Sequence, residues 1–218
     1  EIIQNKVRKN IFFKIIINLI LKYSNKIVVV NRLNRKVNIL KKYKKKIHII
    51  PNCVDYNFFN KKRKLNNKEI ILGTAGRLVK NNMTSVLIDV IFQLKNLYKI
   101  KKIKLYIAGD GPELPNLKKK VKQVNLSHNI IFNGNLDKFG IKKWFDKINI
   151  YIHISQKEFM STSILQAMSC KLPIIASNLF ENNFILKASK TKNALVKNKN
   201  TIIQNGILKI IKKKINIV

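Results

Sequence analysis

From residue 69 onward, short apolar runs alternate with amphipathic segments, and this alternation constrains the fold more than any other feature. The apolar runs EIILGTAG, KIKLYIAGDGP, NIIFNGNL, INIYIHIS and LPIIASN are typical of short buried strands. The segments between them carry apolar residues at helical spacing, as at Val86, Leu87, Val90, Ile91 and Leu94. Helical crossovers between strands require parallel pairing, so we expect an α/β fold with a Rossmann-like parallel sheet and helices on both faces.

The first 50 residues have a different order of elements. An apolar helix is followed by the strand IVVVN, a Lys-rich helix and the strand IHII. Pro51 and the polar run 60–68 mark a connection into the rest of the chain. We therefore expect a boundary after residue 50, with residues 51–218 forming the main domain and residues 201–218 a basic amphipathic helix.

The net charge of +35 comes from 45 Lys and Arg residues against 10 Asp and Glu residues. Such a charge is compatible with a nucleic-acid partner or an anionic membrane surface. However, 40 of the basic residues are Lys, and Asn and Ile are also abundant, as an AT-rich genome would encode at tolerant surface positions. A nucleic-acid reader would use more Arg for its bidentate geometry. We favour compositional bias over a basic polyanion-binding module, which stays an alternative.

The stretch KEFMSTSILQAMSCKLP (157–173) places a lone carboxylate, Glu158, before a hydroxyl-rich helix start. Ser161 is a suitable N-cap for this helix. The free N–H groups of a helix start bind anions, and the hydroxyls of Ser161, Thr162 and Ser163 add donors. The stretch alone is compatible with a diphosphate site and with an ordinary capped core helix.

Several stretches occur in an order that resembles retaining GT-B-fold glycosyltransferases of family 4, the glycosyl transferases group 1. They are IHIIPNCVD, TAGRLV, LYIAGDGPE, IIFNG and EFMSTSILQAMSCKLPIIAS. The resemblance implies that residues 51–218 are a nucleotide-sugar donor-binding domain and residues 1–50 the tail of an N-terminal, acceptor-side domain that is otherwise missing. It also implies no metal and no cofactor beyond the nucleoside-diphosphate sugar.

The same resemblance assigns roles to individual residues. Glu158 would contact the donor sugar, and Gln166 stands where a Glu accepts hydrogen bonds from the ribose. Arg77 would neutralise the diphosphate; Asn82 stands where a Lys is usual, and Lys80 lies two residues nearer to Arg77. The other expected donor-binding residues follow strand ends: Gly76, Gly109, Gly111, Asn135 and Leu136.

Some positions depart from the family's pattern. Cys53, Phe159 and Lys171 stand where Gly is usual and add side chains to backbone that uses the freedom of glycine. Asn82 and Gln166 each remove a charge. A catalytically weakened nucleotide-sugar-binding remnant is therefore an alternative to an active enzyme.

The sequence thus predicts a hexosyltransferase-type enzyme that transfers a sugar to an acceptor hydroxyl, on a polysaccharide, a lipopolysaccharide or a lipid-linked glycan. Cys53 and Cys170 have no paired spacing, so a reducing, cytoplasmic location is expected. The net positive charge is compatible with peripheral association at the inner face of the membrane. We expect residues 1–218 alone to bind the donor weakly. His153, in IHIS, is interpreted as a strand-packing residue.

Overall fold

The computed structural model describes residues 11–31, 38–60, 69–97, 99–100, 102–158, 160–187, 193–196 and 205. The chain divides into two compact units, Glu1–Asn52 and Cys53–Val218. The helix expected over residues 201–218 lies outside the described residues, apart from Asn205.

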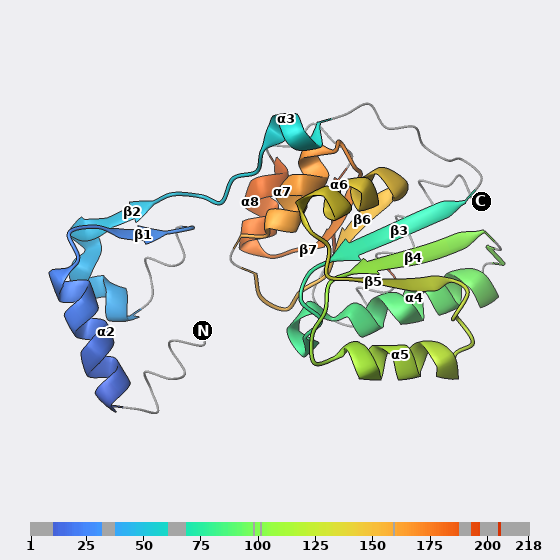
Figure 1. Ribbon diagram of the computed structural model, residues 1–218, viewed down its shortest axis with the longest axis horizontal. Helices are drawn as coiled ribbons and strands as arrows, with labels where there is room; N and C mark the ends of the chain where they lie inside the picture. Colours follow the sequence, from blue (N-terminus) through green and yellow to red (C-terminus); the bar gives the residue numbers. More distant parts are fainter. Residues whose placement is uncertain are drawn as a thin grey trace. The chain divides into compact units, whose positions relative to one another are not determined.

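The first unit contains α2 (Ile11–Tyr23), β1 (Ile27–Val29), the 3₁₀ helix η2 (Asn38–Lys46) and β2 (Ile47–Ile49). Strands β1 and β2 pair in parallel, with Ile27 opposite Ile47 (Figure 1). The predicted order of apolar helix, strand, basic helix and strand is confirmed, and the basic segment forms a 3₁₀ helix. The Lys46 ammonium group donates to the backbone carbonyls of Lys22 and Ser24, which ties η2 to the end of α2.

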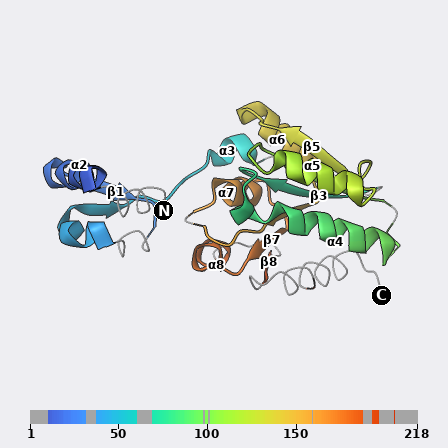
Figure 2. The ribbon, with the colours of Figure 1, turned by 90° about the horizontal axis from the view of Figure 1, so that it is seen from below.

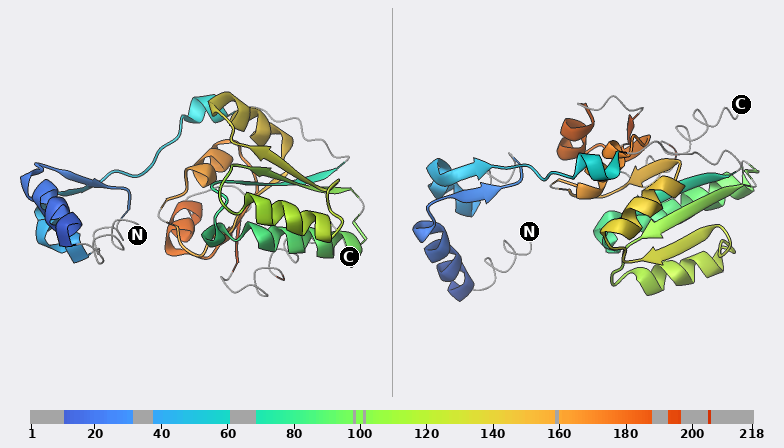
Figure 3. Two further views of the ribbon diagram at one scale, coloured as in Figure 1. Left: turned by 60° about the horizontal axis from the view of Figure 1, so that its bottom comes forward. Right: turned by 45° about the horizontal axis from the view of Figure 1, so that its top comes forward.

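The second unit is built on a six-stranded sheet with the order β5-β4-β3-β6-β7-β8 (Figure 3). All pairings in this sheet are parallel, as predicted. Its strands are β3 (Ile70–Ala75), β4 (Ile103–Ala108), β5 (Ile130–Gly134), β6 (Ile150–His153), β7 (Ile174–Ser177) and β8 (Asn193–Val196). The first five correspond to the apolar runs of the sequence, whereas β8 was not predicted.

Helices cover both faces of this sheet, which confirms the predicted fold class (Figures 1 and 2). On one face lie α4 (Thr84–Asn96) and α5 (Leu114–Gln123), and the α4 side chains predicted to be apolar and inward are all buried. On the other face lie α3 (Tyr56–Phe59), α6 (Lys138–Lys147), α7 (Thr162–Ser169) and α8 (Phe180–Lys187). Successive strand residues point to opposite faces, so Leu72 joins the first core and Ile71 the second.

The strand order fixes where a ligand can bind. From β3 the chain moves outward through β4 to β5 and then returns to β6, on the other side of β3. The carboxyl ends of β3 and β6 therefore flank the topological switch point, where open α/β sheets bind their ligands. The loops that follow β3, β4, β5 and β6 all start at this edge.

Candidate functional site

Arg77 lies two residues after the end of β3 and lines a pocket at the switch point. Gly76 and Asn82 line the same pocket from the β3–α4 connection, Thr84 from the first residue of α4, and His153 from the end of β6. Both strands that flank the switch point thus contribute to one pocket. Arg77, which carries a permanent positive charge, is thus one of the residues at this pocket.

The loop that carries Arg77 is braced by two asparagines. Asn82 Nδ2 donates to the Arg77 carbonyl over 2.6 Å, so this amide closes the loop on itself. Asn81 Nδ2 donates to Ser155 Oγ over 3.1 Å and to the Lys157 carbonyl over 3.0 Å. The Asn81 side chain therefore joins the loop after β3 to the segment that leads into Glu158.

The GDGP turn after β4 packs directly against this loop. The Leu78 N–H donates to the Asp110 carbonyl over 2.8 Å, and the Gly109 N–H donates to the Gly134 carbonyl over 2.7 Å. Gly109 and Gly111 have φ values of +123° and +157°, and a Cβ at either position would collide with the carbonyl oxygen of Gly76 or Leu78. Glycine is required here because backbone meets backbone.

Asn135 and Leu136 follow β5. The last residue of β5, Gly134, accepts the hydrogen bond from the Gly109 N–H of this turn. Asn135 is exposed, whereas Leu136 is partly buried against the α6–α7 core. The next residue, Asp137, caps α6 by accepting a hydrogen bond from the Gly140 N–H over 2.6 Å. Asn135 and Leu136 thus lie between the end of β5 and the capped start of α6, at the carboxyl edge of the sheet.

The start of α7 lies beside the end of β3. Ser161 Oγ accepts a hydrogen bond from the Ile164 N–H over 3.3 Å, so the predicted N-cap is confirmed. Ser163 Oγ lies 2.7 Å from the Tyr151 hydroxyl, which also donates to the Ala75 carbonyl over 3.2 Å. One tyrosine thus bridges the start of α7 and the residue before Gly76. On the same helix, Thr162 is exposed and Gln166 half-buried.

Glu158 contacts His153, the residue interpreted from the sequence as a strand-packing residue. Glu158 Oε2 lies 2.7 Å from His153 Nε2, and the two side chains are 20% and 9% exposed. Burial raises the pKa of Glu181, in the first turn of α8, and the charge of Glu158 raises it further. A second carboxylate therefore lies in the electrostatic neighbourhood of Glu158. Burial also raises the pKa of Tyr151, which stays protonated.

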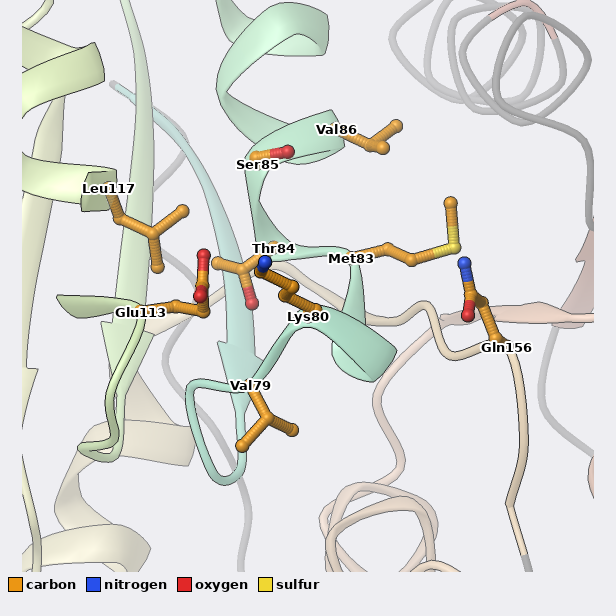
Figure 4. A pocket seen from close by; sticks show the side chains of 9 residues that line it. All are labelled: Val79, Lys80, Met83, Thr84, Ser85, Val86, Glu113, Leu117 and Gln156. Carbon is orange, nitrogen blue, oxygen red and sulfur yellow. The ribbon is translucent and has the colours of Figure 1, made fainter.

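Lys80 lies in a different pocket from Arg77. This second pocket has a volume of about 230 Å³, and Figure 4 shows the side chains that line it. Thr84 contributes to both pockets, whereas Glu113 and Leu117 of the α5 region line only the pocket of Lys80. Lys80, the residue expected from the sequence to act together with Arg77, thus lines the same pocket as Glu113.

Residues 55–216 match the family of glycosyl transferases group 1, which covers nearly all of the second unit. The chain belongs to this family. Among curated relatives, CapJ of Staphylococcus aureus is 32% identical over 136 residues, covering 62% of this chain and 34% of CapJ. An uncharacterised glycosyltransferase of Methanocaldococcus jannaschii is 33% identical over 155 residues, covering 69% of this chain and 38% of that protein. The chain spans about a third of the length of these relatives.

Solved structures of GT-B glycosyltransferases share the fold. TarM superimposes with a TM-score of 0.74 at 21% identity, covering 94% of this chain and 39% of TarM. HepE of Anabaena, in complex with UDP and glucose, superimposes with a TM-score of 0.73 at 15% identity, covering 92% of this chain and 57% of HepE. At such identities the likeness establishes the architecture of the group 1 chain.

Two further properties concern only the described residues of this group 1 chain. Within them, no group of three or more His, Cys, Asp or Glu side chains could hold a metal ion. None of the helices described is long and apolar enough to cross a membrane.

The contacts of Asn81 and Tyr151, the burial of Glu181 and the contact of His153 with Glu158 were not predicted from the sequence. A signal for two of them was present, because Tyr151 and His153 are alternate residues of one strand and so share a face. Buried polar side chains need hydrogen-bond partners. Glu158, five residues after His153, is a nearby acceptor in the sequence. Asn81 and Glu181 carry no comparable local signal.

Proposed function

We propose that this group 1 chain binds the nucleoside-diphosphate sugar for a retaining, family 4 transfer of a hexose to an acceptor hydroxyl. The observation that supports it is the convergence of Arg77, the start of α7 and Glu158 at the switch point. Their neighbourhood follows from the contacts of Tyr151 with Ala75 and Ser163, and from the contacts of Asn81 with residues 155–157.

The chemistry of this transfer requires stabilisation of a departing nucleoside diphosphate. Arg77 and the N–H groups of the α7 start would offset the charge that develops on the leaving phosphate, so no metal is needed. Glu158 would accept hydrogen bonds from hydroxyls of the donor sugar. The bond from C1 to the phosphate oxygen breaks as the acceptor oxygen attacks the same face, and the leaving phosphate takes the acceptor proton.

The named relatives support a glycan or lipid-linked acceptor. A Streptococcus pneumoniae relative, 29% identical over 85 residues, is an alpha-monoglucosyldiacylglycerol synthase. The structural neighbours HepE and pneumococcal GtfA were solved with UDP together with glucose or GlcNAc. We propose that the protein acts in polysaccharide, lipopolysaccharide or related glycan synthesis, in the cytoplasm at the inner face of the membrane. An N-terminal domain would supply the acceptor contacts.

A catalytically weakened remnant is the second candidate. It is favoured by the use of the Asn82 amide as a brace on the Arg77 carbonyl and by the position of Lys80 in another pocket. In that case the donor clamp would contain Arg77 without its second cation, and binding would persist while turnover fell.

A calorimetric panel tests the proposal. UDP, GDP and ADP are titrated into the protein, each alone and as a sugar nucleotide such as UDP-glucose, GDP-mannose or ADP-glucose. We expect one base to bind and Arg77→Ala to weaken it about tenfold or more, as for a lost charged hydrogen bond. Binding that is unchanged in Arg77→Ala would contradict the assigned diphosphate site. Release of the nucleoside diphosphate from the sugar nucleotide then separates an enzyme from a remnant.

A further inference from the structure

The contact between His153 and Glu158 links the sheet to the proposed sugar-facing loop. Its N···O distance is 2.7 Å, and with 9% and 20% of the side chains exposed, little water competes for it. A ring N–H that donates to a carboxylate forms a charge-assisted hydrogen bond, one of the stronger kinds in proteins. Glu158 itself belongs to an irregular segment between β6 and α7, without a regular element to fix it.

The His153 ring is fixed from behind. It stacks on the Tyr151 ring, with centroids 6.3 Å apart and an interplanar angle of 23°. Tyr151 is fully buried, and its hydroxyl contacts both Ala75 and Ser163. The imidazole is thus held by the same tyrosine that joins β3 to α7. A group that contacts His153 is therefore fixed in position relative to the end of β3, two residues before Arg77, and to the start of α7.

A second carboxylate, that of Glu181, makes a hydrogen-bond donor to Glu158 favourable. Glu181 is buried in the first turn of α8, and the pKa of its carboxyl group is raised by burial and by Glu158. Two carboxylates in one partly desolvated region repel each other. A hydrogen-bond donor on Glu158 lowers the cost of keeping it charged and keeps its carboxylate from turning away.

We propose that His153 is a positioning residue for Glu158, and that its ring N–H fixes the carboxylate in the orientation that receives the hydroxyls of the donor sugar. This inference rests on the proposed function. It assigns to the His153–Glu158 contact an effect on recognition of the sugar, beyond any effect that His153 has on the nucleoside diphosphate as a residue of the Arg77 pocket. A carboxylate must be held to within about 0.5 Å to recognise a hydroxyl pattern, and a loop alone does not provide that.

The test uses a matched pair of variants. In His153→Gln the amide nitrogen reaches about as far as Nε2 and can still donate to Glu158, whereas in His153→Asn it ends near the position of Nδ1 and cannot. Both replacements are polar and smaller than His, so their effects on packing are similar. His153→Leu, Glu158→Gln and the His153→Leu/Glu158→Gln double variant complete the set. Each folded variant is titrated with the nucleoside diphosphate and with its sugar nucleotide.

Because His153 also lines the Arg77 pocket, the affinity of each variant for the nucleoside diphosphate serves as the reference for its affinity for the sugar nucleotide. We expect His153→Asn and His153→Gln to bind the nucleoside diphosphate within about twofold of each other. Affinity for the sugar nucleotide should fall about tenfold in His153→Asn, His153→Leu and Glu158→Gln, the loss of one charged hydrogen bond. It should stay within about threefold in His153→Gln, and the double variant should lose no more than the single ones because the residues act as a unit.

Other outcomes would overturn the inference. Equal sugar-nucleotide affinity in His153→Asn and His153→Gln would make the histidine a packing residue only, and this comparison decides even if His153→Leu does not fold. Losses that multiply in the double variant would show that the two side chains act independently. If the wild type binds no nucleoside diphosphate, the proposed function itself fails, and the inference fails with it.

Discussion

Asn82 donates its side-chain amide to the backbone carbonyl of Arg77, with an N···O distance of 2.6 Å. The residue that stands where the family's pattern has a Lys thus shapes the loop that carries Arg77. The geometry keeps Asn82 at the Arg77 pocket, which it lines together with His153. A Lys side chain at position 82 would extend from the same backbone position, at the edge of the Arg77 pocket.

We predict that Asn82→Lys raises the affinity for the nucleoside diphosphate about tenfold, because an ammonium group adds a charged hydrogen bond to the phosphate. Calorimetric titration measures this gain. Asn82→Ala is the matched control, since it removes the brace on Arg77 without adding charge. If Asn82→Lys binds no better than Asn82→Ala, the pocket is not the phosphate site.

Gln166→Glu is expected to strengthen binding of the ribose. A carboxylate forms charge-assisted hydrogen bonds with hydroxyls that are roughly twice as strong as those of an amide oxygen. We expect the affinity for the nucleoside diphosphate to rise about threefold to tenfold, and the gain to shrink for the 2′-deoxy nucleotide. A gain that is equal for the ribo and deoxy forms would place Gln166 away from the sugar of the nucleotide.

Lys171 ends α7 in the left-handed conformation, with a φ of +55°. The Lys171 N–H donates to the Met168 carbonyl and the Leu172 N–H to the Ala167 carbonyl, which is a Schellman motif. The sequence departure at this position therefore carries a steric cost. Lys171→Gly should raise the free energy of unfolding by about 1 kcal/mol, measured by urea denaturation.

The control for this prediction is Lys147→Gly, in the last turn of α6, where the backbone is helical. Glycine there should lower the free energy of unfolding by about 0.5–1 kcal/mol, because it adds only freedom to the unfolded chain. Equal effects of the two substitutions would argue against strain at position 171.

Glu181 gives the protein a specific pH dependence of stability. Its pKa in the folded state is raised above the ordinary value of 4.5, so the folded protein binds this proton more tightly than the unfolded chain. The stabilisation by the protonated form is therefore complete below the ordinary pKa and is lost as the pH rises through the raised one. Glu181→Gln, which stays neutral, should be more stable than the wild type at pH 7.

Urea denaturation at about pH 4 and about pH 7 checks this sign. The advantage of Glu181→Gln should shrink at the lower pH, where the wild-type carboxyl is also protonated. An advantage that is the same at both pH values would mean that the Glu181 pKa is not raised.

Local chemistry explains why much of the fold could be predicted. Strand and helix periods, the N-cap at Ser161 and the glycines of the GDGP turn are properties of a few neighbouring residues, so they can be read from the chain alone. The alternation of elements then requires parallel strands and gathers Arg77 and Glu158 at one edge of the sheet. The stretches that resemble the group 1 family are local motifs of the same kind, so the family could also be predicted from the sequence.

Only the tertiary structure decided how the site is held together. Tyr151 meets Ala75, 76 residues away in sequence, and Asn81 meets Ser155, 74 residues away. Such contacts depend on strand order and on the path of each loop, which no local pattern fixes. The pairing of His153 with Glu158 and the separation of Lys80 from Arg77 belong to this class, because both depend on the paths of the segments that follow β3 and β6.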